Sequence, residues 1–408
     1  MTREDAVRLD AADPLGALRE RFALPADLIY LDGNSLGALP RDAASRVADT
    51  VTREWGDGLI RSWNDGWIDA PARVGGKLAG LVGAESHEVT IADSTSVNLY
   101  KLLVAALGAN PGRRTILTEA GNFPTDLYLA QGVAATLPGV SVRAVARGAV
   151  LDALDDTVAV VLLTHVHYRT AERYDLAEVT AAVQAAGALM LWDLSHSVGA
   201  VAIDLNGARA DLAVGCGYKY LNGGPGAPAF LYAAERHQAA MRSPLTGWMG
   251  HAAPFAFGDD YAPGPGVSRF LCGTPPILGL AALEASVDLF LEADRVALYA
   301  KGQALCDAFI AGVEERCAGF DLTLVTPREP AARGSHVSFA HSQAWPVTAA
   351  LIARGVIGDF RAPDLLRFGF TPLYVGFEDV WRAVDTLCDI LTSGAWDEPR
   401  FHARAVVT

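Results

Sequence analysis

Lys219 has the clearest chemical potential in this sequence, because it lies between two tyrosines and just before a glycine-rich turn. The run YKYLNGGPG covers residues 218–226 and follows an apolar stretch typical of a buried strand. Burial lowers the pKa of a lysine, and the neutral amine is the form that makes a Schiff base with a carbonyl. For a lone lysine, the alternative interpretation is a side chain that snorkels to water beside an ordinary hairpin.

A second candidate group is WDLSH at residues 192–196, where an aspartate and a histidine end a predicted strand. We expect Asp193 and Lys219 at the same carboxyl edge of one sheet, where open α/β sheets bind their ligands. A buried aspartate there can keep a pyridinium nitrogen protonated, which makes the ring of pyridoxal phosphate (PLP) an electron sink. His196 could orient the carboxylate. Taken alone, a helix N-cap also explains Asp193, and a buried structural position also explains His196.

Two further runs are compatible with a phosphorylated aromatic ligand. DSTSVN at 93–98 opens an apolar helix over 99–107, and hydroxyls with free N–H groups at a helix N-terminus bind phosphate. NFPTD at 122–126 follows a predicted strand at 115–118, and the ring of Phe123 could stack on a flat cofactor. Each run is also an ordinary cap or loop sequence, so neither decides the function alone.

The elements that must position these groups form an α/β pattern. Residues 158–163 are a continuous apolar run typical of a strand covered on both faces, and a second such run follows at 188–192. Between them, Asp175 is placed to cap a helix whose apolar face and terminal glycine are Leu176, Val179, Val183 and Gly187. This βαβ unit predicts a parallel sheet with helices on its faces, and further strands are predicted at 115–118, 212–214 and 227–232.

The C-terminal third changes character, which predicts a second, smaller domain. A long helical pattern at 287–310 is followed by short strand-like segments at 336–339 and 365–370. We therefore predict an α/β fold with a mostly parallel central sheet and helices on both faces, plus a smaller α+β domain. The predicted parts are an N-terminal segment that packs with the small domain (1–60), a large domain (61–290) and the small domain (291–408).

The composition excludes several classes of protein. The 408 residues are 51% hydrophobic and 20% charged, which requires a large packed core. The net charge of −14 and the scattered basic residues argue against nucleic acid as a partner. No run approaches the roughly 18 apolar residues of a membrane-spanning helix, and the first residues lack a signal-peptide pattern. The five cysteines are odd in number and widely spaced, so we expect a soluble protein of a reducing, cytoplasmic compartment.

Two motifs would indicate other chemistry, but their context argues against it. GNSLG at 33–37 matches the G-x-S-x-G elbow of serine hydrolases, yet few residues precede it and Pro40 obstructs the helix that should follow. A tight turn is the better interpretation. His165 and His167 share one face of a strand end, but no cysteine or carboxylate cluster accompanies them, so we expect no bound metal.

Taken together along the chain, these runs resemble the PLP enzymes of the aspartate aminotransferase fold (fold type I), and within them the kynureninase family. The resemblance spans nearly the whole chain. It includes five further runs: YLDGNSLG at 30–37, WGDGLIRSWNDGW at 55–67, GWMGH at 247–251, RFLCGTPPIL at 269–278 and GVIGDFRAPDLLRFGFTPLY at 355–374.

The resemblance implies a set of cofactor residues. Lys219 would form the internal aldimine with PLP, and Asp193, with His196 behind it, would pair with the pyridine nitrogen. Phe123 would stack on the ring, and Tyr218, near the phosphate, would also relay a proton. The remaining implied cofactor residues are Thr95, Ser96, Pro124, Thr125, Asp126, Thr164, Trp248 and Thr274, of which the last two would reach across from a neighbouring subunit.

The resemblance also implies three substrate residues, Arg367, Trp63 and Asn34, with Arg367 as the clamp for the α-carboxylate. The local pattern agrees with that role. Leu366, Phe368 and Phe370 alternate onto one face of a strand, which leaves Arg367 on the other face, and a guanidinium fork suits a carboxylate.

The implied reaction is hydrolytic cleavage of the Cβ–Cγ bond of L-kynurenine to anthranilate and L-alanine, in tryptophan catabolism, by a homodimer with its active site at the subunit interface. In this resemblance Trp63 and Thr274 look like the bacterial type, with a large apolar wall near the aniline ring and no obvious partner for a 3-hydroxyl. An unpaired buried hydroxyl is costly, so 3-hydroxykynurenine is the expected poorer substrate. The alternative is another fold type I enzyme, such as an aminotransferase or a cysteine desulfurase. A desulfurase needs a mobile cysteine, however, and Cys272 lies close to two prolines.

Overall fold

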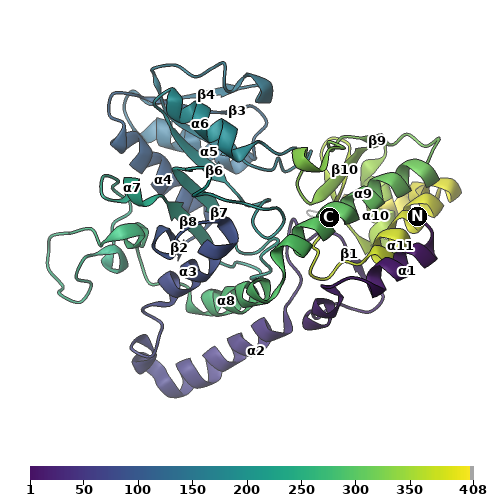
Figure 1. Cartoon of the computed structure of the whole chain (residues 1–408), viewed down its shortest axis with the longest axis horizontal. Coiled ribbons are helices and arrows are strands. Elements are labelled where there is room, and N and C mark those ends of the chain that lie inside the picture. Colours follow the sequence, from purple (N-terminus) through teal and green to yellow (C-terminus); the bar gives the residue numbers. More distant parts are fainter. Residues whose placement is uncertain (405–408) are drawn as a thin grey trace.

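The computed structural model describes residues 1–404 and has two parts, a large α/β part and a smaller part beside it (Figure 1). The large part is built on a seven-stranded sheet with the strands in the order β2 (Val89–Ala92), β8 (Ala229–Ala233), β7 (Leu212–Gly215), β6 (Leu189–Asp193), β5 (Val158–Thr164), β3 (Thr115–Glu119) and β4 (Ser141–Val145). Only β8 runs against the strands beside it, and the other pairs are parallel. The predicted fold class, with a mostly parallel sheet, is confirmed.

Helices cover both faces of this sheet, because alternate residues of a strand point to opposite sides. In β5, Val160 and Leu162 belong to the apolar cluster formed with α4 (Thr95–Ala109) and α5 (Pro124–Thr136). Val161 and Leu163 belong to the cluster formed with α3 (Ala70–Val82), α6 (Leu176–Ala185) and α8 (Ile277–Glu292). Every residue of β5 is therefore buried, as the sequence predicts.

The predicted βαβ unit forms between β5 and β6. The side chain of Asp175 accepts a hydrogen bond from the N–H of Glu178 and so caps α6. Gly187 follows the helix with a φ of +77°, a conformation that costs glycine little because it has no Cβ. The unit ends at Asp193, and the carboxyl end of β6 is thereby placed beside the ends of β5 and β7.

The smaller part has a four-stranded antiparallel sheet in the order β12 (Asp359–Arg361), β13 (Leu365–Gly369), β10 (His336–Ala340) and β9 (Thr323–Leu324). Its helices are α9 (Arg295–Arg316), α10 (Ala344–Ala353), α11 (Phe377–Ser393) and α12 (Pro399–His402). Among residues 1–404, α9 alone is long and apolar enough to cross a membrane by length and composition. It packs against α11 and β10 and buries Leu305, Phe309 and Val313, as the core helix of a domain does.

The prediction of one long helix at 287–310 is wrong. The chain breaks at Ala293 and Asp294, between α8 and α9, and Asp294 caps α9 by accepting hydrogen bonds from the N–H groups of Val296 and Ala297. Apolar residues on both sides of the break, such as Phe290 and Leu298, are buried, so the apolar pattern runs on through it.

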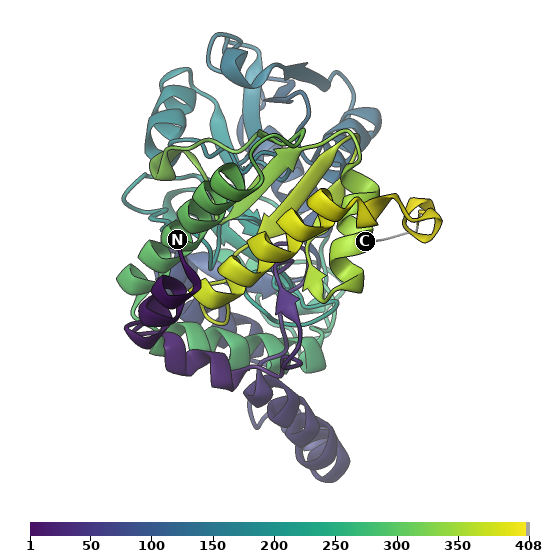
Figure 2. The ribbon, with the colours of Figure 1, turned by 90° about the vertical axis from the view of Figure 1, so that its right-hand side faces the viewer.

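The N-terminal segment contacts both parts. Helix α1 (Arg3–Ala11) packs on α11, and β1 (Ile29–Tyr30) pairs with β11 (Val356–Ile357) of the smaller part. Helix α2 (Arg41–Asp49) packs on α8 instead, and the helical segment that continues to Gly58 protrudes from the body of the molecule (Figure 2). The domain boundaries at residues 60 and 290 stay a prediction.

The remaining elements are short and lie in the connections. They are the helix α7 (Glu235–Gln238) and helical turns at Gly16–Arg21, Thr50–Gly58, Leu59–Trp63, Ser86–Glu88, Arg147–Ala149, Trp248–Gly250, Gly266–Phe270, Pro330–Ala332 and Ala395–Asp397.

Candidate active site

A cavity of about 210 Å³ opens at the carboxyl edge of the large sheet, where β3, β5, β6 and β7 end. It brings together most of the predicted cofactor residues, although these come from segments far apart in the sequence. Its lining is Thr95, Ser96, Leu99, Phe123, Thr125, Asp126, Thr164, Tyr168, Asp193, Ser195, His196, Tyr218 and Lys219. Leu99, Tyr168 and Ser195 are the lining residues that the sequence did not indicate.

Lys219 is buried, with 8% of its surface exposed, and its amine faces a histidine. Its Nζ lies 2.9 Å from Nε2 of His196 and 5.5 Å from the ring centre of Phe123. Burial, together with the positive charge of Lys219, holds the pKa of His196 well below its usual range, so His196 is neutral. The carboxylate of Asp193 accepts a hydrogen bond from the N–H of Ser195, so the role of His196 in orienting Asp193 stays a prediction.

Asp193 and Asp126 form a buried carboxyl pair on the floor of the cavity. Burial raises the pKa of Asp193, and burial together with the charge of Asp193 raises the pKa of Asp126 well above its usual range. Since two adjacent carboxyl groups do not both ionise readily in a buried site, a cationic ring nitrogen would be a favourable partner. The hydroxyl of Thr164 lies within hydrogen-bond distance of Asp126, and this fixes one side of the pair.

The N-terminus of α4 forms the opposite end of the cavity. Ser94 caps the helix by accepting a hydrogen bond from the N–H of Val97, and the hydroxyl of Thr95 is buried without a partner. Lys101, fully buried, binds Asp93 and the carbonyl of Phe270, and so ties this turn to the 266–270 segment. Free N–H groups and hydroxyls at a helix N-terminus suit a phosphate.

Arg367 belongs to a second cluster, on β13 of the smaller part. Its Nε donates to Oδ1 of Asp359 at 2.7 Å, Nη2 donates to the other oxygen of Asp359 and to Oγ of Ser35, and Nη1 donates to the carbonyl of Tyr168. The side chains of Arg367 and Asp359 are 1% exposed. Arg361 binds the same carboxylate and the same serine.

Ser35 therefore takes part in an arginine–carboxylate cluster rather than in a hydrolase triad. Its hydroxyl donates to Oδ2 of Asp359 at 2.9 Å. The surrounding segment links both parts of the molecule, because the N–H of Gly369 donates to the carbonyl of Leu31 and the N–H of Gly37 donates to the carbonyl of Tyr218. Asn34, in the middle of this segment, is fully buried and both of its amide atoms lack a partner.

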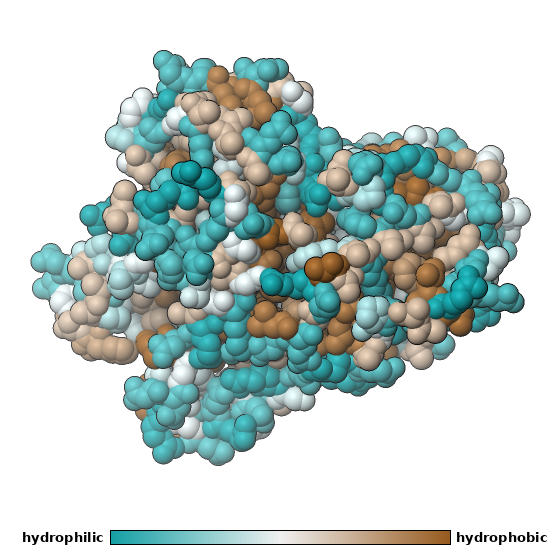
Figure 3. Space-filling model, in the orientation of Figure 1, coloured by the Kyte–Doolittle hydropathy of each residue, from teal (hydrophilic) through white to brown (hydrophobic). Residues whose placement is uncertain are grey.

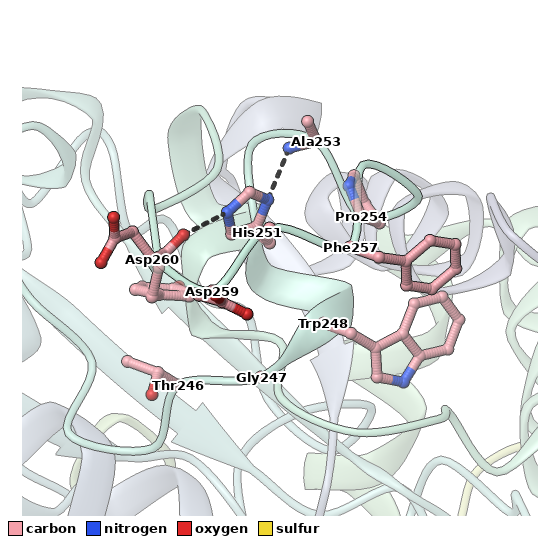
Figure 4. Close-up of a pocket in the computed structure, with 11 residues that line it drawn as sticks. Thr246, Gly247, Trp248, His251, Ala253, Pro254, Phe257, Asp259 and Asp260 are labelled. Atoms are coloured by element: carbon pink, nitrogen blue, oxygen red, sulfur yellow. Dashed lines mark hydrogen bonds between the residues drawn. The ribbon is translucent and has the colours of Figure 1, made fainter.

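Some predicted site residues do not line the cavity. Trp248 lines a separate pocket of about 400 Å³ formed by residues 246–261, in which it lies near Phe257 (Figure 4). Trp63 packs edge-on against Trp248, with ring centres 5.9 Å apart, and Thr274 is exposed. Pro124 begins α5 beside the cavity without lining it.

The residues behind the competing interpretations have other partners. Nδ1 of His165 lies 2.9 Å from Oγ of Ser197, and Nε2 of His167 lies 3.0 Å from the carbonyl of Gly121. Within residues 1–404, no group of three or more His, Cys, Asp or Glu is placed to hold a metal ion. The thiol of Cys272 contacts the carbonyl of Thr246 at 3.7 Å.

The fold and the lysine-centred cavity define a PLP-type enzyme scaffold of fold type I. Solved structures of this kind resemble the chain: a C-DES variant with glycine covalently linked to its PLP cofactor (18% identity, TM-score 0.80, 91% of this chain and 99% of the other) and the cysteine desulfurase of Thermococcus onnurineus NA1 (19% identity, TM-score 0.77, 92% and 98%). At these identities the likeness shows the fold alone.

The sequence comparisons are more specific. Residues 298–387 match the model of the kynureninase C-terminal domain. Kynureninases of Burkholderia mallei (strain SAVP1) and Burkholderia pseudomallei (strain K96243) are each 56% identical, and that of Pseudomonas fluorescens is 51% identical, all over 100% of both chains. The chain belongs to the kynureninase family.

Proposed function

We propose that this protein is a PLP-dependent kynureninase that hydrolyses the Cβ–Cγ bond of L-kynurenine to anthranilate and L-alanine in tryptophan catabolism. The observation that carries the proposal is the buried amine of Lys219, placed beside the neutral His196, the ring of Phe123 and the carboxyl pair of Asp193 and Asp126. A cytoplasmic location is part of the proposal, and the five cysteines, all free thiols, suit a reducing compartment.

The polar groups that line the cavity match the parts of PLP that they would bind. Lys219 would hold the aldehyde carbon, Asp193 the ring nitrogen, and Thr95 and Ser96 with the N-terminus of α4 the phosphate. A phosphate would give the hydroxyl of Thr95 the hydrogen-bond partner that it lacks. A cationic ring nitrogen would stabilise negative charge on the carboxyl pair, in which the pKa of Asp126 is raised. When bound, PLP supplies an electron sink for the negative charge that develops at the substrate carbon atoms.

The reaction then needs proton transfers by the protein's own groups. The amine of Lys219 would take the proton from Cα of the substrate. Burial raises the pKa of Tyr218, so its hydroxyl stays protonated and is suited to donate the proton that Cβ receives after cleavage. His196 is neutral, and its Nε2 lies within hydrogen-bond distance of the amine of Lys219. It would therefore hydrogen-bond to this nitrogen during the reaction.

Substrate recognition falls to the second cluster. Arg367 would bind the α-carboxylate, with Asn34 beside it. Trp63 does not belong to this cluster, because it packs against Trp248 outside the cavity, and it would contact the aromatic ring from that side. Figure 3 shows apolar side chains gathered where the large part meets the smaller part, which suits an aromatic substrate.

The test is the protein with PLP and L-kynurenine in one cuvette, with the visible absorbance and the anthranilate fluorescence followed together. We expect a yellow protein that makes anthranilate, with a higher kcat/KM for L-kynurenine than for 3-hydroxykynurenine, because a 3-hydroxyl buried against the apolar wall that Trp63 would form would lack a partner. A yellow protein that makes no anthranilate would contradict the assigned reaction, and sulfide release from cysteine would then favour the desulfurase alternative. A higher kcat/KM for 3-hydroxykynurenine would contradict the substrate preference alone.

We also propose that the active unit is a homodimer in which Trp248 and Thr274 complete the active site of the neighbouring subunit. The segments that carry Trp63 and Trp248 expose large apolar side chains: Trp55, Leu59, Ile60, Phe255 and Phe257 are between 56% and 83% exposed. Exposed apolar groups of this number mark an interaction surface. A second copy of the chain would cover them and supply the two residues that each cavity lacks.

Replacing Phe257 by aspartate should weaken this dimer, because a charge would be buried in an apolar contact. We expect the dimer dissociation constant to rise at least about 100-fold, with activity lost at low protein concentration and recovered at high concentration. Analytical ultracentrifugation with parallel assays measures both. Val296→Asp is the matched control, since Val296 is 81% exposed on α9, away from these segments. A wild-type protein that is monomeric and fully active would overturn the proposal.

A further inference from the structure

Three buried side chains, one beside Lys219 and two near the strands β10 and β13, carry polar atoms without a hydrogen-bond partner. These atoms are both ring nitrogens of His336, both amide atoms of Asn34 and Nδ1 of His196. His336 and Asn34 are 0% exposed and His196 is 3% exposed. Since buried polar groups are almost always paired, a cluster of this kind indicates a ligand with complementary polar atoms.

The strand register places His336 on the same face of the small sheet as Arg367. Strands β10 and β13 pair so that His336 lies opposite Gly369 and Ser338 lies opposite Arg367. Residues two apart on a strand point to the same face, and residues directly opposite on antiparallel strands share that face. The side chain of His336 is therefore a near neighbour of the guanidinium group.

Asn34 occupies the space that Gly369 leaves free. A Cβ at position 369 would lie 1.8 Å from Oδ1 of Asn34, so only glycine allows the amide to lie over the strand at this point. On the other side, the ring centre of His336 lies 5.4 Å from that of His196, whose Nε2 contacts the amine of Lys219. His336 thus connects the Arg367 cluster to the Lys219 cavity.

The surroundings of His336 are positively charged. Burial, and next the charge of Arg367, holds its pKa well below the usual range, and Lys219 and Arg361 act in the same direction. The neutral imidazole carries one N–H donor and adds no further positive charge. A neutral donor amid cationic groups is suited to an anion that also touches those groups.

We propose that His336 is a specificity-determining substrate residue that donates its ring N–H to the α-carboxylate bound by Arg367, with the amide of Asn34 beside it. This inference rests on the proposed function, because the role of Arg367 belongs to that proposal. It assigns the carboxylate two kinds of partner, a guanidinium from β13 and a neutral imidazole from β10.

The test compares a carboxylate ligand with its analogue that lacks the carboxylate. L-Alanine and ethylamine are titrated against the PLP-loaded dimer, and binding is read from the change in the visible absorbance spectrum. In His336→Leu we expect the affinity for L-alanine to fall about 10- to 100-fold, the usual effect of losing a hydrogen bond to a charged group. The affinity for ethylamine should change less than about 2-fold. His336→Gln, which keeps an N–H donor, should retain most of the affinity for L-alanine.

Two results would overturn the inference. An equal loss for both ligands would mean that His336 only supports the fold, and unchanged binding of L-alanine in His336→Leu would mean that His336 does not touch the carboxylate. If His336→Leu does not fold, NMR spectra of wild-type protein labelled at histidine decide: the His336 ring signals must shift with L-alanine and not with ethylamine. A wild type that makes no anthranilate would contradict the proposed reaction but leave this comparison of ligands intact.

Discussion

Replacing Lys219 by alanine is expected to lower kcat for anthranilate formation by at least about 1000-fold. The reason is that the amine of Lys219 has two proposed roles, covalent attachment and proton transfer, and the variant loses both. The variant should also lose the yellow colour that links the cofactor to the amine. The cavity offers no other lysine among its lining residues, and the nearby titratable nitrogen, Nε2 of His196, belongs to an imidazole whose pKa is held well below its usual range.

The measurement combines anthranilate fluorescence with the visible spectrum of the purified variant. Lys77→Ala is the matched control, because Lys77 is a partly exposed lysine that binds Glu284 and Asp288 outside the cavity. We expect this control to keep wild-type kcat and colour. A Lys219→Ala protein within about 10-fold of wild-type kcat would overturn the assignment of the amine, and with it the proposed chemistry.

The cavity was largely predictable because parallel strands deliver their carboxyl ends to one edge. Lys219, Asp193 and Phe123 each follow a run of buried apolar residues, and a reader of the sequence can place them at that edge without knowing any contact. The α4 terminus was predictable for a similar reason, since Ser94 and Thr95 open an apolar helix. In each case the signal is local to a few residues.

The contacts that sequence reasoning missed join residues far apart in the chain. Ser35 donates a hydrogen bond to Asp359, which lies 324 positions away in the sequence, and the sequence around neither residue indicates the contact. We expected His196 behind Asp193, but its Nε2 contacts the amine of Lys219. Tertiary packing, and not the spacing of these residues in the sequence, determines this contact. The break before α9 was missed because apolar residues continue through it, and only the capping role of Asp294 reveals it.

The largest expected effect on substrate binding comes from Arg367. In Arg367→Gln we expect kcat/KM for L-kynurenine to fall at least about 100-fold, mainly through KM, because removing one partner of a buried charge pair costs several kcal/mol. The loss has two sources. The α-carboxylate of the substrate would lose its guanidinium fork, and Asp359, 1% exposed, would be left with only Arg361 to balance its charge.

Arg361→Gln is the sharpest control for this prediction, because Arg361 binds the same oxygen of Asp359 and the same hydroxyl of Ser35. The side chain of Arg361 is 38% exposed, whereas that of Arg367 is 1% exposed. Water therefore already reaches Arg361 and can take over part of its contact with Asp359, so losing Arg361 costs less binding energy. We expect less than about a 10-fold loss of kcat/KM in Arg361→Gln. Steady-state kinetics of both variants, with melting temperatures measured beside them, separates the two arginines. A larger KM effect at Arg361 than at Arg367 would move the carboxylate site from β13 to β12 and overturn the assignment.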